Sequence, residues 1–476
     1  MKEGYVPQDQ RKKILLITDD IRLPSGVGNV GKDIILNTAH RYNWVNLGGA
    51  LKHPDQGKRF DLSQDVNKEM EIEDSQVVVY PSSGYGDPVL LRNLLSIEKP
   101  DAIFLITDPR YFTWLFQIEN EIRTKIPIVY LNIWDDYPAP AYNKEFYESC
   151  DALLGISKQT VNINKLVLRD KAESKIIDYV PHGINTKYYF PVNKDDQQLV
   201  DFKKHLFGGR DIEFALLFNS RNIRRKQIPD TMLAWKYFID QLPQEKADKC
   251  TLVLHTQPVD EHGTDLIAIR DYIFGPDSQA ITFSSNRLPV NMMNLLYNSC
   301  DAQILLTSNE GWGLSLTEAL IVGNPIIANV TGGMQDQMRF VDDKGNWFTP
   351  NADIPSNHTG RFKKHGKWAF PVYPSNRSLV GSVPTPYIWD DRCRAEDAAE
   401  RIMEVYNMSK EEREEAGLAG REWALGNESG FTAKVMGERV IKNMEELFNT
   451  WQPRERFSFI NANDYSPDVV NHKLLY

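Results

Sequence analysis

Short apolar runs recur along the chain, and the stretches between them carry apolar residues at helical spacing. The first run, KILLIT at 13–18, ends at Asp19-Asp20. Continuous apolar runs of this length are typical of parallel strands that are buried on both faces. Further strands are predicted at 44–47, 76–80, 100–107, 127–133, 213–220, 251–256, 281–283, 300–307 and 326–330.

The stretches between the strands predict amphipathic helices. They lie at 88–98, 112–123, 290–299, 396–406, 410–423 and 431–451, with others that begin near 30, 158 and 314. Alternation of strands and helices predicts an α/β fold with parallel sheets. A chain of 476 residues has room for two or three domains of ordinary size.

One stretch, 308–333, combines several features of a binding site: SNEGWGLSLTEALIVGNPIIANVTGG. It predicts a strand, a glycine loop, a helix, a turn and a second strand. Glu310 and Glu318 lie eight residues apart, and Gly311 and Gly313 stand between them. Glycines allow the backbone to approach a ligand closely, so the helix N-terminus has room for one.

The chemistry of this stretch favours a phosphorylated sugar. If the helix begins near Leu314, the amides of Gly313, Leu314 and Ser315 have no helical partner and can bind a diphosphate, assisted by the helix dipole. Glu310 can accept hydrogen bonds from sugar hydroxyls, and Glu318 can accept them from two vicinal hydroxyls. An ordinary capped helix with a solvated Glu318 is the alternative.

The segment EGWGLSLTEALIVGNPIIANVTGG resembles the signature of retaining family 4 glycosyltransferases, which have the GT-B fold. The resemblance implies two Rossmann-like doubly wound domains that face a central cleft, with the last helix crossing back to the first domain. It implies that Glu310 holds the donor sugar and Glu318 the nucleoside ribose. The other donor-binding residues that it implies are Gly311, Trp312, Gly313, Leu314 and Ser315.

The same resemblance suggests domain boundaries. IIDYVPHGIN at 176–185 is similar to the interdomain signature of the family. We therefore predict an N-terminal acceptor domain at 1–190, a C-terminal nucleotide-sugar domain at 191–430, and a crossing helix with a tail at 431–476.

A basic segment, RNIRRK, follows the strand predicted at 213–220. Arg221 and Lys226 have the five-residue spacing of the Arg and Lys that family members carry after this strand. They would form a cationic clamp for a diphosphate leaving group. The alternative is a solvated basic turn.

The loop after the first strand imitates a phosphate-binding loop, because Gly26 is followed at the right spacing by Gly31 and Lys32. The next residue is Asp33, and not the Ser or Thr that would hold magnesium, so we reject that interpretation. The loop is similar to the family loop that faces donor phosphate and acceptor. Gly26 and Gly28 are its candidate residues.

Three further residues are candidates for sugar or acceptor contact. Many relatives carry a His-Asp pair after the strand predicted at 127–133, whereas this chain has Trp134, Asp135 and Asp136. The two aspartates can bind sugar hydroxyls, or they can cap a helix. His182 is a site candidate, with a structural turn histidine as the alternative.

The stretch 343–392 departs from the family pattern. It is rich in Pro, Asn and aromatic residues, contains three tryptophans, and carries the basic run RFKKHGK at 361–367. Its aromatic content argues against disorder. We interpret it as a folded insertion that helps to bind the acceptor or a partner subunit; a passive insertion is equally open.

The composition is that of a soluble globular protein, with 41% hydrophobic and 25% charged residues. The formal net charge of -10 and the lack of a long basic tract disfavour a nucleic acid partner. The four cysteines are far apart and form no CxxC pair. No signal-peptide core or membrane span is recognisable, so we expect a cytoplasmic location.

The resemblance, together with these features, implies a retaining, metal-independent hexosyltransferase-type enzyme. Its donor would be a UDP-, GDP- or ADP-sugar, with no other cofactor and no bound metal. The acceptor stays open between a carbohydrate, a lipid-linked sugar, a small molecule and a modified nucleic acid, and the oligomeric state is open too. Alternative functions are a sugar-nucleotide epimerase, a glycogen-synthase-like enzyme, and a non-catalytic sugar-nucleotide-binding protein.

Overall fold

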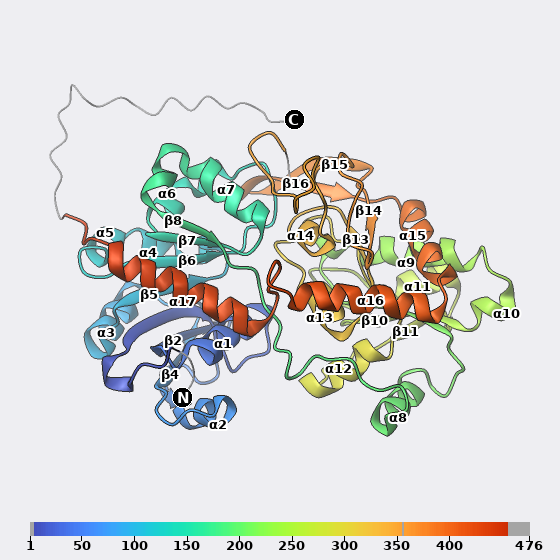
Figure 1. Cartoon of the computed structure of the whole chain (residues 1–476), viewed down its shortest axis with the longest axis horizontal. Coiled ribbons are helices and arrows are strands. Elements are labelled where there is room, and N and C mark those ends of the chain that lie inside the picture. Colours follow the sequence, from blue (N-terminus) through green and yellow to red (C-terminus); the bar gives the residue numbers. More distant parts are fainter. Residues whose placement is uncertain (1–3, 355–356, 456–476) are drawn as a thin grey trace. The chain divides into compact units, whose positions relative to one another are not determined.

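The computed structural model describes residues 4–354 and 357–455. The chain forms two compact units, each built around its own sheet (Figure 1). Unit 1 contains Met1–Pro181, Pro350–Pro355 and Ala433–Tyr476. Unit 2 contains His182–Thr349 and Ser356–Thr432. Each unit is described separately below.

The sheet of unit 1 has eight strands in the order β3-β4-β2-β1-β5-β6-β7-β8. All neighbours are parallel except β3, which is antiparallel to β4. The strands are β1 Lys12–Asp19, β2 Tyr42–Ala50, β3 Phe60–Asp61, β4 Val77–Ser83, β5 Ala102–Ile106, β6 Ile128–Asn132, β7 Ala152–Gly155 and β8 Ile176–Tyr179. The apolar run predicted at 13–18 is the core of β1, where Ile14 to Ile17 are completely buried.

The α-helices of unit 1 lie between these strands, except the last one, which follows unit 2 in the sequence. They are α1 Gly26–Thr38, α2 Ser63–Met70, α3 Pro88–Glu98, α4 Thr113–Phe116, α5 Glu119–Ile122, α6 Lys144–Glu148, α7 Lys158–Leu168 and α17 Ala433–Thr450. The single helix predicted at 112–123 is wrong, because Ile118 (φ -112°, ψ 15°) interrupts it between α4 and α5. At the end of α4, Phe116 stacks on Phe146 of α6, with ring centroids 5.2 Å apart.

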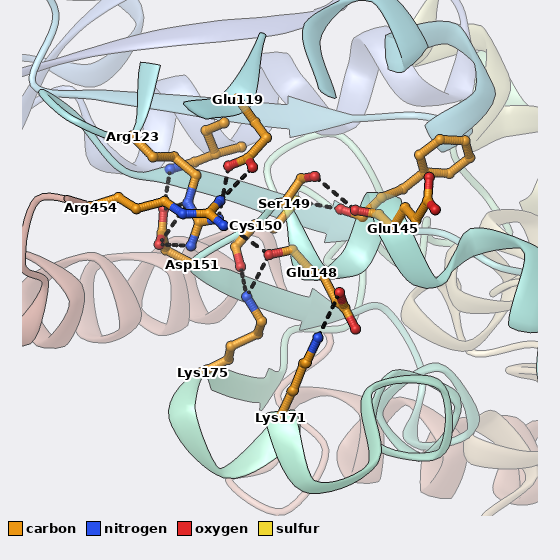
Figure 2. A network of polar contacts seen from close by, with 12 residues as sticks. Glu119, Arg123, Glu145, Glu148, Ser149, Cys150, Asp151, Lys171, Lys175 and Arg454 are labelled. Carbon is orange, nitrogen blue, oxygen red and sulfur yellow. Dashed lines mark hydrogen bonds and ion pairs between the residues drawn. The ribbon is translucent and has the colours of Figure 1, made fainter. Parts of the chain in front are cut away.

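The last helix, α17, belongs to unit 1, although unit 2 separates it from the rest of that unit in sequence (Figure 1). It packs against α1, where Gly437 lies so close to Asn37 that an added Cβ would meet the Asn37 Cβ at 2.6 Å. The segment after the helix is held by a network of polar contacts (Figure 2). In this network Arg454 donates its amide to the Arg123 carbonyl oxygen at 2.8 Å and pairs with Glu119.

Arg123 is the centre of the network in Figure 2. Its guanidinium donates to Asp151 at 2.7 Å and to Glu119 at 2.9 Å. Lys175 donates to the carbonyl oxygen of Glu148 at 2.9 Å and to that of Cys150. Since Arg123 pairs with both Glu119 and Asp151, these largely buried charges compensate one another, and the network joins the segment before β6 to the start of β7.

Unit 2 has a six-stranded parallel sheet in the order β11-β10-β9-β12-β13-β14, and a separate hairpin of β15 and β16. The sheet strands are β9 Phe214–Asn219, β10 Cys250–His255, β11 Ile281–Phe283, β12 Ala302–Leu305, β13 Ile326–Asn329 and β14 Ala369–Val372. The hairpin strands are β15 Asn376–Ser382 and β16 Thr385–Arg392. The prediction of an α/β fold with parallel sheets in two domains is confirmed.

The α-helices of unit 2 lie between and after its strands. They are α8 Gln197–Leu206, α9 Ile228–Ile239, α10 Gln244–Ala247, α11 Leu266–Phe274, α12 Val290–Asn298, α13 Leu314–Val322, α14 Met334–Met338, α15 Ala395–Asn407 and α16 Lys410–Leu425. The stretch 343–392 is therefore not a wholly separate insertion. Its segment β14 pairs with β13 in the central sheet, and only the hairpin stands outside that sheet.

In the part of the chain that the structure describes, no helix is both long enough and apolar enough to cross a membrane.

Candidate functional site

The stretch 308–333 folds as predicted, with a helix between two parallel strands. Helix α13 begins at Leu314, after Gly313. Gly313 has φ +90°, a conformation that favours glycine, and it turns the chain from the loop into the helix. A second left-handed glycine, Gly323, ends the helix (φ +96°).

The Gly-Gly turn after β13 contacts the loop that carries Glu310. The Gly333 amide donates to the Glu310 carbonyl oxygen at 3.0 Å. An added Cβ on Gly333 would meet the Gly311 carbonyl oxygen at 2.2 Å, closer than real Cβ contacts occur. A larger residue at 333 would therefore displace the loop that places Glu310.

The Glu310 carboxylate is buried and paired with two cations. Lys226 lies in the 3-10 turn η5 (Arg224–Lys226) that follows β9, and its Nζ contacts Oε2 of Glu310. Arg225 donates from Nη1 to the same oxygen at 3.0 Å and to the Asn309 carbonyl oxygen at 2.8 Å. Burial by itself would raise the pKa of Glu310, but the charges of Lys226 and Arg225 outweigh it and lower the pKa to about 2.

Arg221 does not join this cluster. Its side chain is 61% exposed, and its Nε donates to Asp260 at 3.1 Å. Of the two residues predicted to form a clamp, the structure therefore places Lys226 beside Glu310 and Arg221 at the surface with Asp260. Arg225, which the sequence analysis did not single out, takes the position next to Lys226; its only signal was the basic run 224–226.

Glu318 lies in the second turn of α13 in a different environment. The hydroxyl of Tyr297, a fully buried residue of α12, donates to Glu318 Oε2 at 2.5 Å. The same hydroxyl accepts a hydrogen bond from Asn219 at 2.8 Å. Burial raises the pKa of Glu318 to about 7, although hydrogen bonds from Tyr297 and Tyr189 oppose the rise.

His182 is a buried neutral side chain of unit 2. Burial lowers its pKa to about 4, and the charge of Glu310 only partly opposes that shift. Its Nδ1 has no hydrogen-bond partner within 4–354 and 357–455. Buried polar atoms normally have a partner, so this nitrogen is a place where a ligand or a water could bind.

The remaining predicted donor-binding residues of unit 2, at positions 311–315, are mostly buried, and they differ in which of their groups a ligand can reach. Trp312 is 2% exposed; its indole nitrogen donates to Thr317 at 2.9 Å and its ring packs on Phe431. Any contact of Trp312 with a donor would thus involve its backbone. Gly311 and Ser315 are buried, and Leu314 is half-buried at the helix N-terminus.

In unit 1, α1 begins at Gly26, and the prediction of a start near 30 is wrong. The reason is Ser25, whose Oγ accepts from the Gly28 amide at 2.9 Å and caps the helix. Gly26 and Gly28 therefore lie in the first helical turn. An added Cβ on Gly28 would meet the Leu23 carbonyl oxygen and Ser25 Oγ, both at 2.9 Å, so close packing requires glycine there.

The two aspartates after β6 also differ from each other. Asp136 is completely buried, and its Oδ1 accepts from the Tyr137 amide at 2.6 Å. Asp135 is half-buried. Neither aspartate caps a helix, because the next helical turn, η3 (Ala141–Asn143), begins only after Pro140. Asp135 is the more accessible of the two carboxylates.

The cluster around Glu310 combines a fixed carboxylate, two cations and the N-terminus of α13. Such an arrangement can bind sugar hydroxyls at the carboxylate and a diphosphate at the cations and helix amides. Tyr297 and Asn219, which place Glu318, were not predicted. Both lie at the ends of apolar segments, and no local pattern marks them.

No group of three or more His, Cys, Asp or Glu residues is placed to hold a metal ion in the two described ranges.

Comparison with known proteins agrees with this site. Residues 280–356 match the family model of glycosyl transferases group 1. This segment contains β11, β12, α13 and β13, and therefore both glutamates. A search of curated proteins gives no significant match.

The whole fold is similar to solved GT-B structures. Sucrose-phosphate synthase from Thermosynechococcus elongatus is 14% identical, with a TM-score of 0.64 over 92% of this chain and 100% of that one. HepE from Anabaena, in complex with UDP and glucose, is 12% identical, with a TM-score of 0.62 over 92% of this chain and 100% of that one.

A third structure is the Escherichia coli trehalose-6-phosphate protein bound with UDP-2-fluoro glucose. It is 12% identical, with a TM-score of 0.60 over 91% of this chain and 99% of that one. The fold class is GT-B, and the glycosyl transferases group 1 segment together with this fold supports a glycosyltransferase enzyme.

Proposed function

We propose that the protein is a retaining, metal-independent glycosyltransferase that moves a sugar from a nucleotide diphospho-sugar to an acceptor hydroxyl. The observation that carries this proposal is the buried Glu310–Lys226–Arg225 cluster beside the N-terminus of α13. It offers an acceptor for sugar hydroxyls and positive charge for a diphosphate within one small region. Unit 2 would bind the donor, and unit 1 would bind the acceptor.

The proposed chemistry depends on charge at the leaving group. When the bond between the anomeric carbon and the donor oxygen breaks, its electron pair goes to the diphosphate. Lys226 and the amides of the first turn of α13 would stabilise this developing charge. The acceptor hydroxyl would attack from the same face, and its proton would pass to the departing phosphate oxygen.

Glu310 is suited to hold the sugar and poorly suited to attack it. Its pKa of about 2 keeps it ionised, but Lys226 and Arg225 both occupy its Oε2. Ion pairing of this kind lowers the nucleophilicity of a carboxylate. This supports a single front-face displacement over a covalent intermediate on Glu310.

Glu318 would accept hydrogen bonds from the two ribose hydroxyls. Its pKa of about 7 means that in the empty site it holds a proton for much of the time near neutral pH. Two hydroxyl donors favour the ionised form, so donor binding would release that proton. The exposed Arg221 would move from Asp260 to the diphosphate when the donor is present.

A thermal-shift panel followed by turnover assays tests the proposal, because a ligand stabilises the state that binds it. The panel contains UDP, GDP and ADP and their glucose derivatives. UDP compounds are the first choice, since the similar HepE and trehalose-6-phosphate structures hold UDP ligands. We expect stabilisation by one nucleotide series and turnover of its sugar, with the anomeric configuration retained.

Each other outcome selects a different function. Binding without turnover for any acceptor would indicate a non-catalytic binding protein. Conversion of the sugar nucleotide without acceptor would indicate an epimerase, and an elongating glucan product would indicate a glycogen-synthase-like enzyme. Loss of turnover in the presence of EDTA would contradict the metal-independent mechanism.

A further inference from the structure

The hairpin of β15 and β16 lies outside the central sheet of unit 2 (Figure 1). Its base nevertheless contacts the loops of the candidate site. Its two strands are antiparallel, with an irregularity between Val380 and Ser382. Towards its turn it exposes Leu379 and Val383, which are 57% and 100% accessible. The base is different, because Asp391 is completely buried there.

Asp391 connects the hairpin to both loops that flank α13. Its amide donates to the Ser308 carbonyl oxygen at 2.9 Å, two residues before Glu310. Its carboxylate accepts from the Thr331 hydroxyl at 2.7 Å, next to the Gly-Gly turn. Its carbonyl oxygen accepts from Asn329 at 2.8 Å. A single residue therefore holds the loops before and after α13.

The neighbours of Asp391 extend these contacts to the site's third loop. Asn309 donates to Asp390 at 3.3 Å. Arg392 donates to Gln227 at 2.9 Å and to Asp230 at 2.7 Å. Gln227 directly follows Lys226. The base of the hairpin therefore contacts three segments: the one that carries Lys226, the one that carries Glu310, and the Gly-Gly turn that lies against Gly311.

The other strand of the hairpin is required for this arrangement. Arg377 of β15 donates from Nε to Asp391 Oδ1 at 2.7 Å, and this ion pair is largely buried. A buried carboxylate without a partner would be costly. The pairing of β15 with β16 supplies that partner, so the hairpin as a unit allows Asp391 to reach the loops.

We propose that the β15–β16 hairpin is a positioning element of the donor site, in which Asp391 holds the loops of Glu310 and Thr331 and its neighbour Arg392 holds the segment that follows Lys226. This inference rests on the proposed function. Sugar transfer requires the carboxylate and the cations at fixed separations, and a misplacement of about 1 Å can cost about a hundredfold in rate. The stretch 343–392 thus contributes to the donor side of the reaction.

The sharpest test compares Thr331→Val with Thr331→Ser. Valine keeps the size of the side chain but removes the hydroxyl that contacts Asp391, whereas serine keeps the hydroxyl and removes a methyl group. We expect Thr331→Val to lower kcat/KM about tenfold, mainly through kcat, and Thr331→Ser to stay close to wild type. A purely structural role of Thr331 would instead lower the stability of Thr331→Val and leave kcat/KM of the folded enzyme unchanged.

Asp391→Asn tests the proposed residue directly, with Asp343→Asn as the matched control. Asp343 lies in the same stretch and also pairs with an arginine, Arg361, at 3.1 Å, but both side chains are exposed. We expect Asp391→Asn, and not Asp343→Asn, to accelerate amide hydrogen exchange at 307–313 and 331–333. If Asp391→Asn fails to fold, the half-exposed Arg392→Ala gives the same comparison for 224–228.

Hydrogen exchange separates this inference from the proposed function. If wild type binds neither UDP, GDP nor ADP, the proposed function fails, while faster exchange in the loops of Asp391→Asn would still support the hairpin as their positioning element. If wild type binds and turns over a donor, but exchange and kcat/KM are unchanged in both Asp391→Asn and Thr331→Val, the hairpin inference is overturned.

Discussion

Glu310 and Glu318 stand eight residues apart beside one helix N-terminus, and their environments shift their pKa values in opposite directions. Burial acts on both in the same sense, by disfavouring the charged form. The partners differ. Glu310 contacts the cations Lys226 and Arg225, whereas Glu318 contacts the neutral hydroxyl of Tyr297.

This difference shows that the partner, and not the depth of burial, decides which carboxylate is permanently charged. Two cations bring the pKa of Glu310 to about 2, and the hydrogen bonds from Tyr297 and Tyr189 leave the pKa of Glu318 near 7. The site therefore has one fixed charge and one group that titrates near neutrality. Under the proposed function, Glu310, which stays charged, binds the donor sugar, and Glu318, which titrates, binds the ribose.

The largest expected effect comes from Lys226→Ala, which removes the cation nearest Glu310. We expect kcat/KM for the donor to fall about 10²–10³-fold, because a preorganised charge at the leaving group is lost. The pKa of Glu310 should rise, which makes this glutamate more like Glu318. Initial rates of nucleoside diphosphate release at several pH values measure both effects.

Lys249→Ala is the control for this variant. Lys249 also pairs with carboxylates of unit 2, Asp211 and Glu213, but it is exposed and far from Glu310 in sequence and sheet position. Its loss should leave turnover unchanged. Equal activity of Lys226→Ala and wild type, with both folded, would show that the cluster is not the donor site.

The second prediction concerns stability. The folded pKa of Glu318, about 7, lies above its ordinary value of 4.5, so the folded protein holds a proton that the unfolded chain releases. The contribution of Glu318 is fully present below pH 4.5 and is lost as the pH rises through 7. Relative to Glu318→Gln, the wild-type free energy of unfolding should fall by about 3 kcal/mol over this window.

Urea unfolding of both proteins at pH 5 and pH 8 measures the difference. Glu310 has the opposite sign, since its contribution is present above pH 4.5 and lost only as the pH falls through 2, below the range of the experiment. Glu404→Gln, the same change at an exposed helix position that pairs with Arg401, is the control variant. A parallel pH dependence of wild type and Glu318→Gln would refute the raised pKa.

The sequence predicted the backbone elements that carry Glu310 and Glu318, but not the partners that shift their pKa values. Apolar runs and glycine positions were sufficient for the strand, the helix start at Leu314 and the place of both glutamates. The GT-B class that the resemblance implied is confirmed by the fold. Local patterns carry such information because a buried parallel strand and a glycine turn are specified by neighbouring residues.

The partners of the two glutamates come from distant segments, and this is why they were missed. Arg225 lies 85 positions from Glu310, and Tyr297 lies 21 from Glu318. Spacing alone favoured Arg221 for the clamp. Spacing does not reveal that Arg221 pairs with Asp260 at the surface. The helix start near 30 was wrong for a local reason, because the capping role of Ser25 was overlooked. The roles of the site residues stay predictions.

The third prediction is a pH dependence of donor binding. Because protonated Glu318 accepts hydroxyl hydrogen bonds poorly, the affinity for UDP-glucose should rise about tenfold between pH 6 and pH 8. UDP-glucose is a suitable probe, since its diphosphate is a diester and takes up no proton in this range. Calorimetry in buffers of different ionisation enthalpy should also detect proton release on binding.

Two variants sharpen this third prediction. Glu318→Gln should bind more weakly at pH 8 and show a flat pH profile. Tyr297→Phe removes the hydroxyl that donates to Glu318, so the rise in affinity should move to higher pH. His182, with a pKa of about 4, does not titrate in this window and cannot produce the same profile. A flat wild-type profile would contradict the assignment of Glu318 to the ribose.

The smallest expected effect concerns the glycine between the two glutamates. Gly313 has φ +90°, and an added Cβ would meet no atom closer than 3.4 Å, so Gly313→Ala should strain the backbone without a clash. Left-handed alanine costs about 1 kcal/mol, which thermal unfolding can detect. Gly323→Ala is the matched variant, because Gly323 has φ +96° at the other end of the same helix and equally open surroundings.

Both variants should lose similar stability, but only Gly313→Ala should also weaken UDP-glucose binding, because only residue 313 fixes the loop of Glu310 against the first turn of α13. Equal binding by the two variants would mean that the loop tolerates a shift at this point, and that the separation of the two glutamates matters less than their partners do.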